Sequence, residues 1–197
     1  MARKYEMKRR AERQEETRRR ITEAAVGLHQ DVGPANATIS AIAERAGVQR
    51  LTVYRHFPDE RTLLSACSSH YRAANPAPDP DAWARIPDPE ERLRGALAQT
   101  YAYHRRTEPM MSKVLRDARV HAPTSEASGP YRQHWDRARY ALVAGWGAED
   151  WRLKRLLAAL GHALDLWTWR SLVHERGLSD EEAIELMVGM VRSSVRD

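Results

Sequence analysis

The sequence is poor in cysteine and contains no long hydrophobic run. Cys67 is its only cysteine, so an internal disulfide is impossible and a cysteine-rich metal site is excluded. No run of about 18 or more apolar residues occurs, so no segment is expected to span a membrane as a helix. The N-terminus is charged, unlike a signal peptide. These absences predict a soluble, cytoplasmic protein without a membrane partner.

Sequence signals of an enzyme are also absent. The chain contains no phosphate-binding glycine loop, no metal-ligand cluster and no nucleophile motif. His162 and Asp165 lie three positions apart, but one pair offers too few ligands for a metal, and a hydrogen-bonded helix face explains it better. We therefore expect no catalytic residue, no cofactor and no bound metal. A catalytic triad that assembles only on folding is left open.

Positive charge is concentrated in the N-terminal part of the chain. Of the 32 Lys and Arg and 27 Asp and Glu side chains, residues 1–75 contain 14 and 9, which leaves 18 of each for residues 76–197. The first twenty residues contain nine basic and four acidic side chains. A basic end on a neutral body indicates contact with a polyanion, although a solvated, frayed arm would carry the same charges.

Apolar residues recur with helical spacing, and no segment alternates as a strand does. The pattern predicts an all-α fold of about nine helices, four before a proline-rich stretch and five after it. The first four are a helix through Ile21 and Leu28, one capped by Thr38, one from Arg50 to His56 and one capped by Asp59. The other five begin at Pro89, Pro109, Gly129, Asp150 and Ser179, and the fourth of these is expected to extend to Gly177.

Residues 38–57 carry the most specific signal. They predict two short helices joined by a turn that contains Gly47, which is a helix-turn-helix arrangement. Ala43 is small where the two helices must cross, and Gly47 accepts the positive φ of the turn. The second helix has a polar outer face, as a helix in a major groove requires.

The segment from Thr17 to Ala73 resembles the TetR family of transcriptional regulators (TetR/AcrR type). The matching motifs, in family order and spacing, are Ile21-x-x-Ala-Ala, Thr38-Ile, Ile42-Ala-x-x-Ala-Gly-Val, and Thr52-Val-Tyr-Arg-His-Phe followed by Leu63-Leu64. The resemblance implies a three-helix DNA-binding domain and a C-terminal ligand-binding and dimerisation domain. We expect a basic arm (1–16), the DNA-binding domain (17–74), a proline-rich linker (75–88) and the ligand-binding domain (89–197).

The resemblance also implies which residues contact DNA. They are Thr38, Ser40, Gln49, Arg50, Leu51, Thr52, Tyr54, Arg55, His56 and Arg61. Arg50 is expected to bind a guanine, and Leu51 a thymine methyl group. Thr38, Tyr54 and His56 are expected to bind phosphates. Two positions depart from the family: Glu60 replaces a frequent lysine, so Arg61 is the expected substitute, and His29 replaces a buried phenylalanine and is expected in the core.

The C-terminal half is rich in aromatic side chains, which at helical spacing are most often core residues. Collectively they can also line an apolar pocket for a small molecule. The predicted lining is Tyr101, His104, Met110, Met111, Leu115, Trp135, Leu142 and Trp146. The last two helices are apolar on more than one face, which predicts a homodimer through a four-helix interface.

These observations predict a repressor that a small-molecule effector releases from a palindromic double-stranded DNA operator. A dimer would place its two recognition helices about one DNA turn apart, roughly 34–36 Å. The alternatives are an enzyme and a nonspecific architectural DNA binder that uses the basic arm. The identity of the effector, the operator sequence and the direction of the effector's action do not follow from the sequence.

Overall fold

The computed structural model describes residues 2–196, and the side chains of residues 5–196. Within this range the chain forms eleven α-helices and no strand, which confirms the all-α prediction. None of the described helices is long and apolar enough to cross a membrane. The chain divides into two compact units, and each is described by itself: residues 1–75 with 109–129, and residues 76–108 with 130–197.

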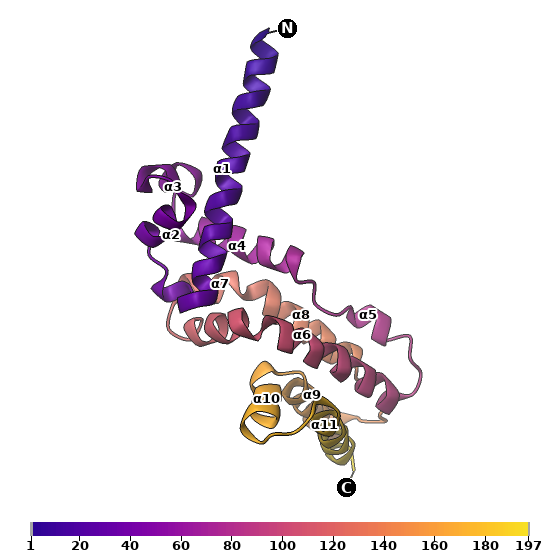
Figure 1. The fold of residues 1–197 in the computed structure, drawn as a ribbon. Coiled ribbons are helices and arrows are strands. Elements are labelled where there is room, and N and C mark those ends of the chain that lie inside the picture. Colours follow the sequence, from indigo (N-terminus) through magenta and orange to yellow (C-terminus); the bar gives the residue numbers. More distant parts are fainter. Residues whose placement is uncertain (1, 197) are drawn as a thin grey trace. The chain divides into compact units, whose positions relative to one another are not determined.

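The first unit contains the predicted helix-turn-helix (Figure 1). Its elements are α1 (Ala2–Val32), the 3-10 turn η1 (Pro34–Asn36), α2 (Ile39–Ala46), α3 (Arg50–His56), α4 (Glu60–Ala74), the end of α6 and α7 (Ala122–Ala127). Side chains of α1, α2, α3 and α4 form one hydrophobic core that includes Ile21, Ala25, Ile42, Ala43, Val53, Phe57, Leu63 and Cys67. The second half of α1 therefore acts as the support on which α2 and α4 pack.

The caps of the short helices follow from the sequence. The Thr38 hydroxyl accepts a hydrogen bond from the Ala41 amide at 3.2 Å, and Asp59 accepts one from Thr62 at 2.7 Å. Both caps satisfy amides that would otherwise lack a partner in the first turn of α2 and of α4. Gly47 ends α2 in the left-handed region, with φ 64°.

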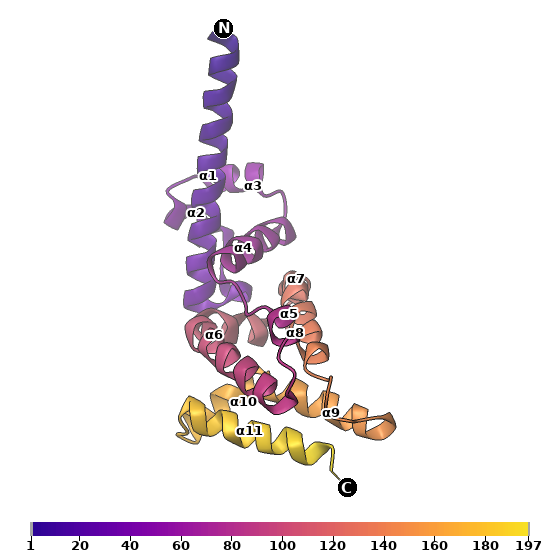
Figure 2. The same ribbon diagram turned by 90° about the vertical axis from the view of Figure 1, so that its right-hand side faces the viewer.

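The second unit is built from the remaining helices (Figure 2). They are α5 (Pro80–Trp83), α6 (Pro89–Asp117) up to Glu108, α8 (Gly129–Ala141), α9 (Asp150–Ala163), α10 (Leu166–Arg170), the π-helical turn η2 (Ser171–Glu175) and α11 (Asp180–Ser194). Its fully buried large side chains include Trp83, Leu93, Leu97, Tyr101, Leu142, Leu156, Leu160 and Trp169. α9 and α11 pack against each other.

Two predictions about helix boundaries are wrong. Pro109 does not begin a helix, because α6 continues through it; the ring removes one backbone hydrogen bond but does not end the helix. The segment from Asp150 to Gly177 is not one helix, because the Asp165 carboxylate accepts the amides of Trp167 and Thr168 and so starts α10.

Two short helices also went unrecognised in the sequence. α5 begins inside the proline-rich stretch, with Pro80 in its first turn, where a missing amide costs nothing. α7 follows α6 after a short loop and likewise has a proline near its start. Residues 109–129, which were expected in the ligand-binding domain (89–197), group with the first unit.

Candidate nucleic-acid interface

The turn between α2 and α3 holds the two helices in a helix-turn-helix geometry. The Gly47 amide donates to the Glu44 carbonyl at 3.0 Å, and the Val48 amide donates to the Ala43 carbonyl at 2.9 Å. These bonds close the end of α2 before the chain turns into α3. Val53 on α3 is completely buried, so α3 is anchored by one face and its other face is free.

The free face of α3 carries most of the predicted DNA-contacting side chains. Leu51 is 67% exposed and Tyr54 is 43% exposed. The other predicted residues of α3 and its N-cap are exposed or half-buried: Gln49, Arg50, Thr52, Arg55 and His56. Thr38 and Ser40 are exposed at the start of α2. The exposed Leu51 side chain offers methyl groups that can contact the methyl group of a thymine.

Arg61, the expected substitute for a phosphate-binding lysine, has a partner within its own unit. Its guanidinium lies 2.6 Å from the Glu126 carboxylate of α7, and both side chains are more than half exposed. Glu60 faces His121 at 3.5 Å. To bind DNA, Arg61 would have to exchange Glu126 for a phosphate. This exchange costs little, because exposed ion pairs are weak.

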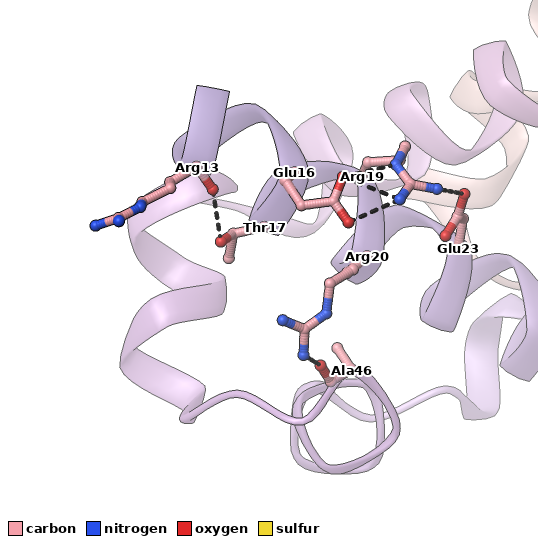
Figure 3. Close-up of polar contacts among 7 residues, drawn as sticks. All are labelled: Arg13, Glu16, Thr17, Arg19, Arg20, Glu23 and Ala46. Carbon is pink, nitrogen blue, oxygen red and sulfur yellow. Dashed lines mark hydrogen bonds and ion pairs between the residues drawn. The ribbon is translucent and has the colours of Figure 1, made fainter. Parts of the chain in front are cut away.

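Two arginines of α1 hold the helix-turn-helix together, although in the sequence both stand out only as charges of the N-terminal segment. Arg18 donates to the His56 carbonyl at 2.7 Å, and its guanidinium carbon lies 4.2 Å from the centre of the Phe57 ring. Arg20 donates to the Ala46 carbonyl at 2.5 Å (Figure 3). Each guanidinium thus meets the negative C-terminal end of a helix, α3 or α2 respectively. No sequence motif reveals this role, because it depends on where α1 lies against the other two helices.

His29 is 5% exposed, in agreement with its expected place in the core. Burial lowers the pKa of His29 from 6.5 to about 4, although the Asp117 carboxylate acts in the opposite direction. The ring is therefore neutral at pH 7. His29 also lines a cavity of about 460 Å³ within the first unit, together with Thr38 and Tyr54.

The predicted ligand-binding residues are divided between the two units. Met110, Met111 and Leu115 belong to the first unit and the other five to the second. In the second unit the ring of His104 lies 6.4 Å from Tyr101 and 5.4 Å from Trp135. Burial lowers the pKa of His104 to about 4, and this neutral ring is hydrogen-bonded to the Leu164 carbonyl at 2.9 Å.

Leu142 is fully buried, and the Trp146 indole donates to its carbonyl at 3.0 Å. The pair His162 and Asp165 forms hydrogen bonds within its own segment. The hydroxyl of Thr168 lies 3.1 Å from His162, and Asp165 caps α10. Among the described side chains no three His, Cys, Asp or Glu residues are placed to hold a metal ion.

Comparisons with known proteins agree with this geometry. The sequence profile of bacterial regulatory proteins of the tetR family matches residues 21–67. An HTH-type transcriptional regulator of Mycobacterium bovis is 42% identical over 55 residues, which are 28% of this chain and 29% of that protein. The class C tetracycline repressor of Escherichia coli is 29% identical over 134 residues, 68% of this chain and 57% of the repressor. The matched stretches thus span less than two thirds of these relatives.

Solved structures share the fold over most of the chain. A TetR-like regulator of Rhodococcus has a TM-score of 0.62 at 17% identity and covers 89% of this chain and 93% of its own. The regulator PfmR of Thermus thermophilus has a TM-score of 0.57 at 17% identity, over 90% of this chain and 99% of its own. The all-helical fold and the exposed face of α3 are those of a protein of the helix-turn-helix class. Residues 21–67 are thus similar to the bacterial regulatory proteins of the tetR family, and the fold of the chain is that of TetR-like regulators.

Proposed function

We propose that this protein is a repressor that binds a near-palindromic operator as a homodimer and leaves it when a small molecule binds the second unit. The observation that carries the proposal is the free face of α3, where Leu51 and Tyr54 are exposed beside Arg50 and Arg55. Such a helix enters a major groove with its first residues on base edges.

Base readout is assigned to the start of α3. Arg50 binds O6 and N7 of a guanine, and Leu51 contacts a thymine methyl group. Thr38 places a hydroxyl and the N-terminus of α2 against a phosphate, where helix amides favour an anion. Tyr54 and His56 bind further phosphates, which position the protein without specifying sequence.

Dimerisation is assigned to the helices after residue 150. Trp151 on α9 is 54% exposed and Leu186 on α11 is 50% exposed, so both helices keep apolar surface that their own unit does not cover. Two copies of this α9–α11 pair would form a four-helix interface. A two-fold symmetric dimer requires a two-fold symmetric operator.

Effector binding is assigned to the aromatic cluster around His104 in the second unit. The neutral His104 and the rings of Tyr101 and Trp135 combine a large apolar surface with few polar groups, which is typical of sites for small organic molecules. An effector that binds better to a dimer with a different spacing of its α3 helices shifts the population away from DNA.

The test is a footprint on DNA that flanks the protein's own coding region, at one fixed salt concentration. The wild type is compared with Arg50→Ala and with Arg119→Ala, a control that removes an exposed arginine outside the helix-turn-helix. A palindromic footprint that only Arg50→Ala abolishes supports the proposal. Equal binding to random DNA overturns it, and a salt dependence that survives Arg50→Ala then favours an architectural DNA binder.

A further inference from the structure

The first half of α1 contributes nothing to the core of its unit. Every described side chain from Tyr5 to Glu16 is exposed, and the first buried side chain of the helix is Ile21. Figures 1 and 2 show this half projecting past α3, on the side of the unit away from α4. A helix without a continuous apolar face gains no stability from packing, so the core does not explain why residues 5–16 extend α1.

One face of this extension is neutralised by its own carboxylates. Lys8 lies 3.8 Å from Glu12. Further along the same face, Arg19 lies 2.7 Å from Glu16 and 2.8 Å from Glu23. These pairs have the i, i+3 and i, i+4 spacing that supports an exposed helix. Each such pair favours the helix by only about 0.2–0.5 kcal/mol, and together they leave little net charge on this face.

The other face carries arginines that no carboxylate neutralises. Arg9, Arg10 and Arg13 are exposed, and among the described side chains none of them has an acidic group within ion-pair distance. Glu6 is the one acidic residue on this face. Figure 3 shows Arg13 pointing away from the cluster of Glu16, Arg19 and Glu23.

Two of the three arginines without a carboxylate partner, Arg9 and Arg13, lie on the side of α1 that faces the end of α2. Arg13 precedes Arg20 by seven residues, about two helical turns, and therefore shares its face. Arg20 is bonded to the end of α2 through the Ala46 carbonyl. At about 1.5 Å per residue, Arg9 lies roughly 16 Å beyond Arg20 along the axis, past the level of α3.

We propose that the N-terminal half of α1, residues 5–16, is a second DNA-binding element, in which Arg9, Arg10 and Arg13 bind phosphates next to the segment that α3 reads. The proposal rests on the proposed function of α3. Successive phosphates of one strand are about 3.4 Å apart along the DNA axis, so the row from Arg9 to Arg13, about 6 Å long, spans two of them. These contacts add affinity and salt dependence without adding base specificity.

The test uses the full chain and a duplex that the wild type selects from a random-sequence pool. Arg10→Gln/Arg13→Gln is compared with Lys8→Gln/Arg19→Gln, which removes the same two charges from the paired face of the same helix. Binding is measured between 50 and 200 mM salt. Log K falls linearly with log salt, and loss of two phosphate contacts makes this slope shallower by about 1.8. Between 50 and 200 mM salt the affinity of Arg10→Gln/Arg13→Gln should therefore fall about tenfold less than that of the wild type.

A shortened version of the selected duplex locates the contact. Shortening the DNA on both sides to the segment protected by α3 is expected to lower wild-type affinity and to abolish its advantage over Arg10→Gln/Arg13→Gln. The proposal is overturned if this variant keeps the wild-type slope, or if the control variant loses as much. Failure of the wild type to select any duplex would instead overturn the proposed function of α3, and the role of α1 with it.

Discussion

The guanidinium of Arg20 donates a hydrogen bond to the backbone carbonyl of Ala46, the last residue of α2. This bond joins α1 to the helix-turn-helix at the point where the chain turns toward α3. A second arginine one half-turn away, Arg18, does the same for the end of α3 through the His56 carbonyl. The orientation of α3 thus depends on two arginines of α1.

Replacing Arg20 is expected to destabilise the first unit. Arg20→Ala removes the donor to Ala46 and should lower the free energy of unfolding by about 1 kcal/mol, the usual net value of such a hydrogen bond. Urea unfolding followed by circular dichroism measures it. Arg19→Ala is the control, because its partners Glu16 and Glu23 are exposed, and it should change stability by less than about 0.5 kcal/mol. Equal losses in both variants would contradict the assigned role.

The conformation of Gly47 predicts the effect of adding one methyl group. Gly47→Ala places a Cβ at φ 64°, which should cost about 1 to 2 kcal/mol of unfolding free energy. Gly95→Ala is the matched control, because Gly95 lies inside α6 with its nearest neighbour at 4.0 Å. That substitution should stabilise by about 0.5 to 1 kcal/mol, since alanine favours a helix interior. A neutral Gly47→Ala variant would show that the turn relaxes.

Leu51 and Val53 lie two positions apart on α3, on its exposed and its buried face. Their substitution is therefore expected to have opposite effects. Leu51→Ala should leave stability within about 0.5 kcal/mol of the wild type and relax base preference at one operator position, measured by selection from a random pool. Val53→Ala should cost about 2 kcal/mol, because Val53 is completely buried. Unchanged base preference in Leu51→Ala would exclude a contact between Leu51 and a base.

The Asp117 carboxylate connects the end of α6 to the turn after α1. It accepts the Ala35 amide at 3.0 Å and the Arg116 side chain at 2.7 Å, and it is almost fully buried. Asp117→Ala leaves the Ala35 amide without a partner and should cost about 1 to 3 kcal/mol in urea unfolding. Asp117→Asn keeps an acceptor oxygen and should lose less. Similar losses would show that the charge, rather than the hydrogen bond, matters.

Stability should decrease when the pH falls below about 6.5, in part because of His29. Burial lowers its pKa to about 4 in the folded protein, so between pH 6.5 and 4 the unfolded chain binds a proton that the folded chain does not. The contribution of the neutral ring is complete above pH 6.5 and is lost toward pH 4, by at most about 3 kcal/mol. The observable is the midpoint of urea unfolding as a function of pH.

His29→Phe removes the titrating group and should flatten this pH dependence. His104 in the second unit has a pKa lowered to about 4 in the same way, so part of the dependence should persist in the variant. His70→Gln, at an exposed position of α4, is the control and should behave as the wild type. Parallel curves for His29→Phe and the wild type would contradict a neutral, buried His29.

The sequence by itself determined the helical class, the helix-turn-helix and its exposed face. These depend on local features: the Thr38 cap, Gly47 at the turn, and the burial pattern of Ile42 and Val53, all of which act within a few residues. The same local logic failed at Pro109 and at Asp165. A proline can be tolerated inside a helix, which its neighbours in the chain do not decide, whereas the start at Asp165 is itself a local cap on the Trp167 and Thr168 amides that the helical spacing of apolar residues did not reveal.

Only the tertiary structure decided which arginines of α1 are free. Arg13 and Arg20 share one helical face and look equivalent in the sequence. Arg20 nevertheless donates to the carbonyl of Ala46, whereas the Arg13 side chain is exposed to solvent. Likewise, Arg61 meets Glu126, a residue 65 positions away in the chain. Such pairings join residues far apart in sequence, and the distance between their charged groups, which sets their energy, exists only after the helices have packed.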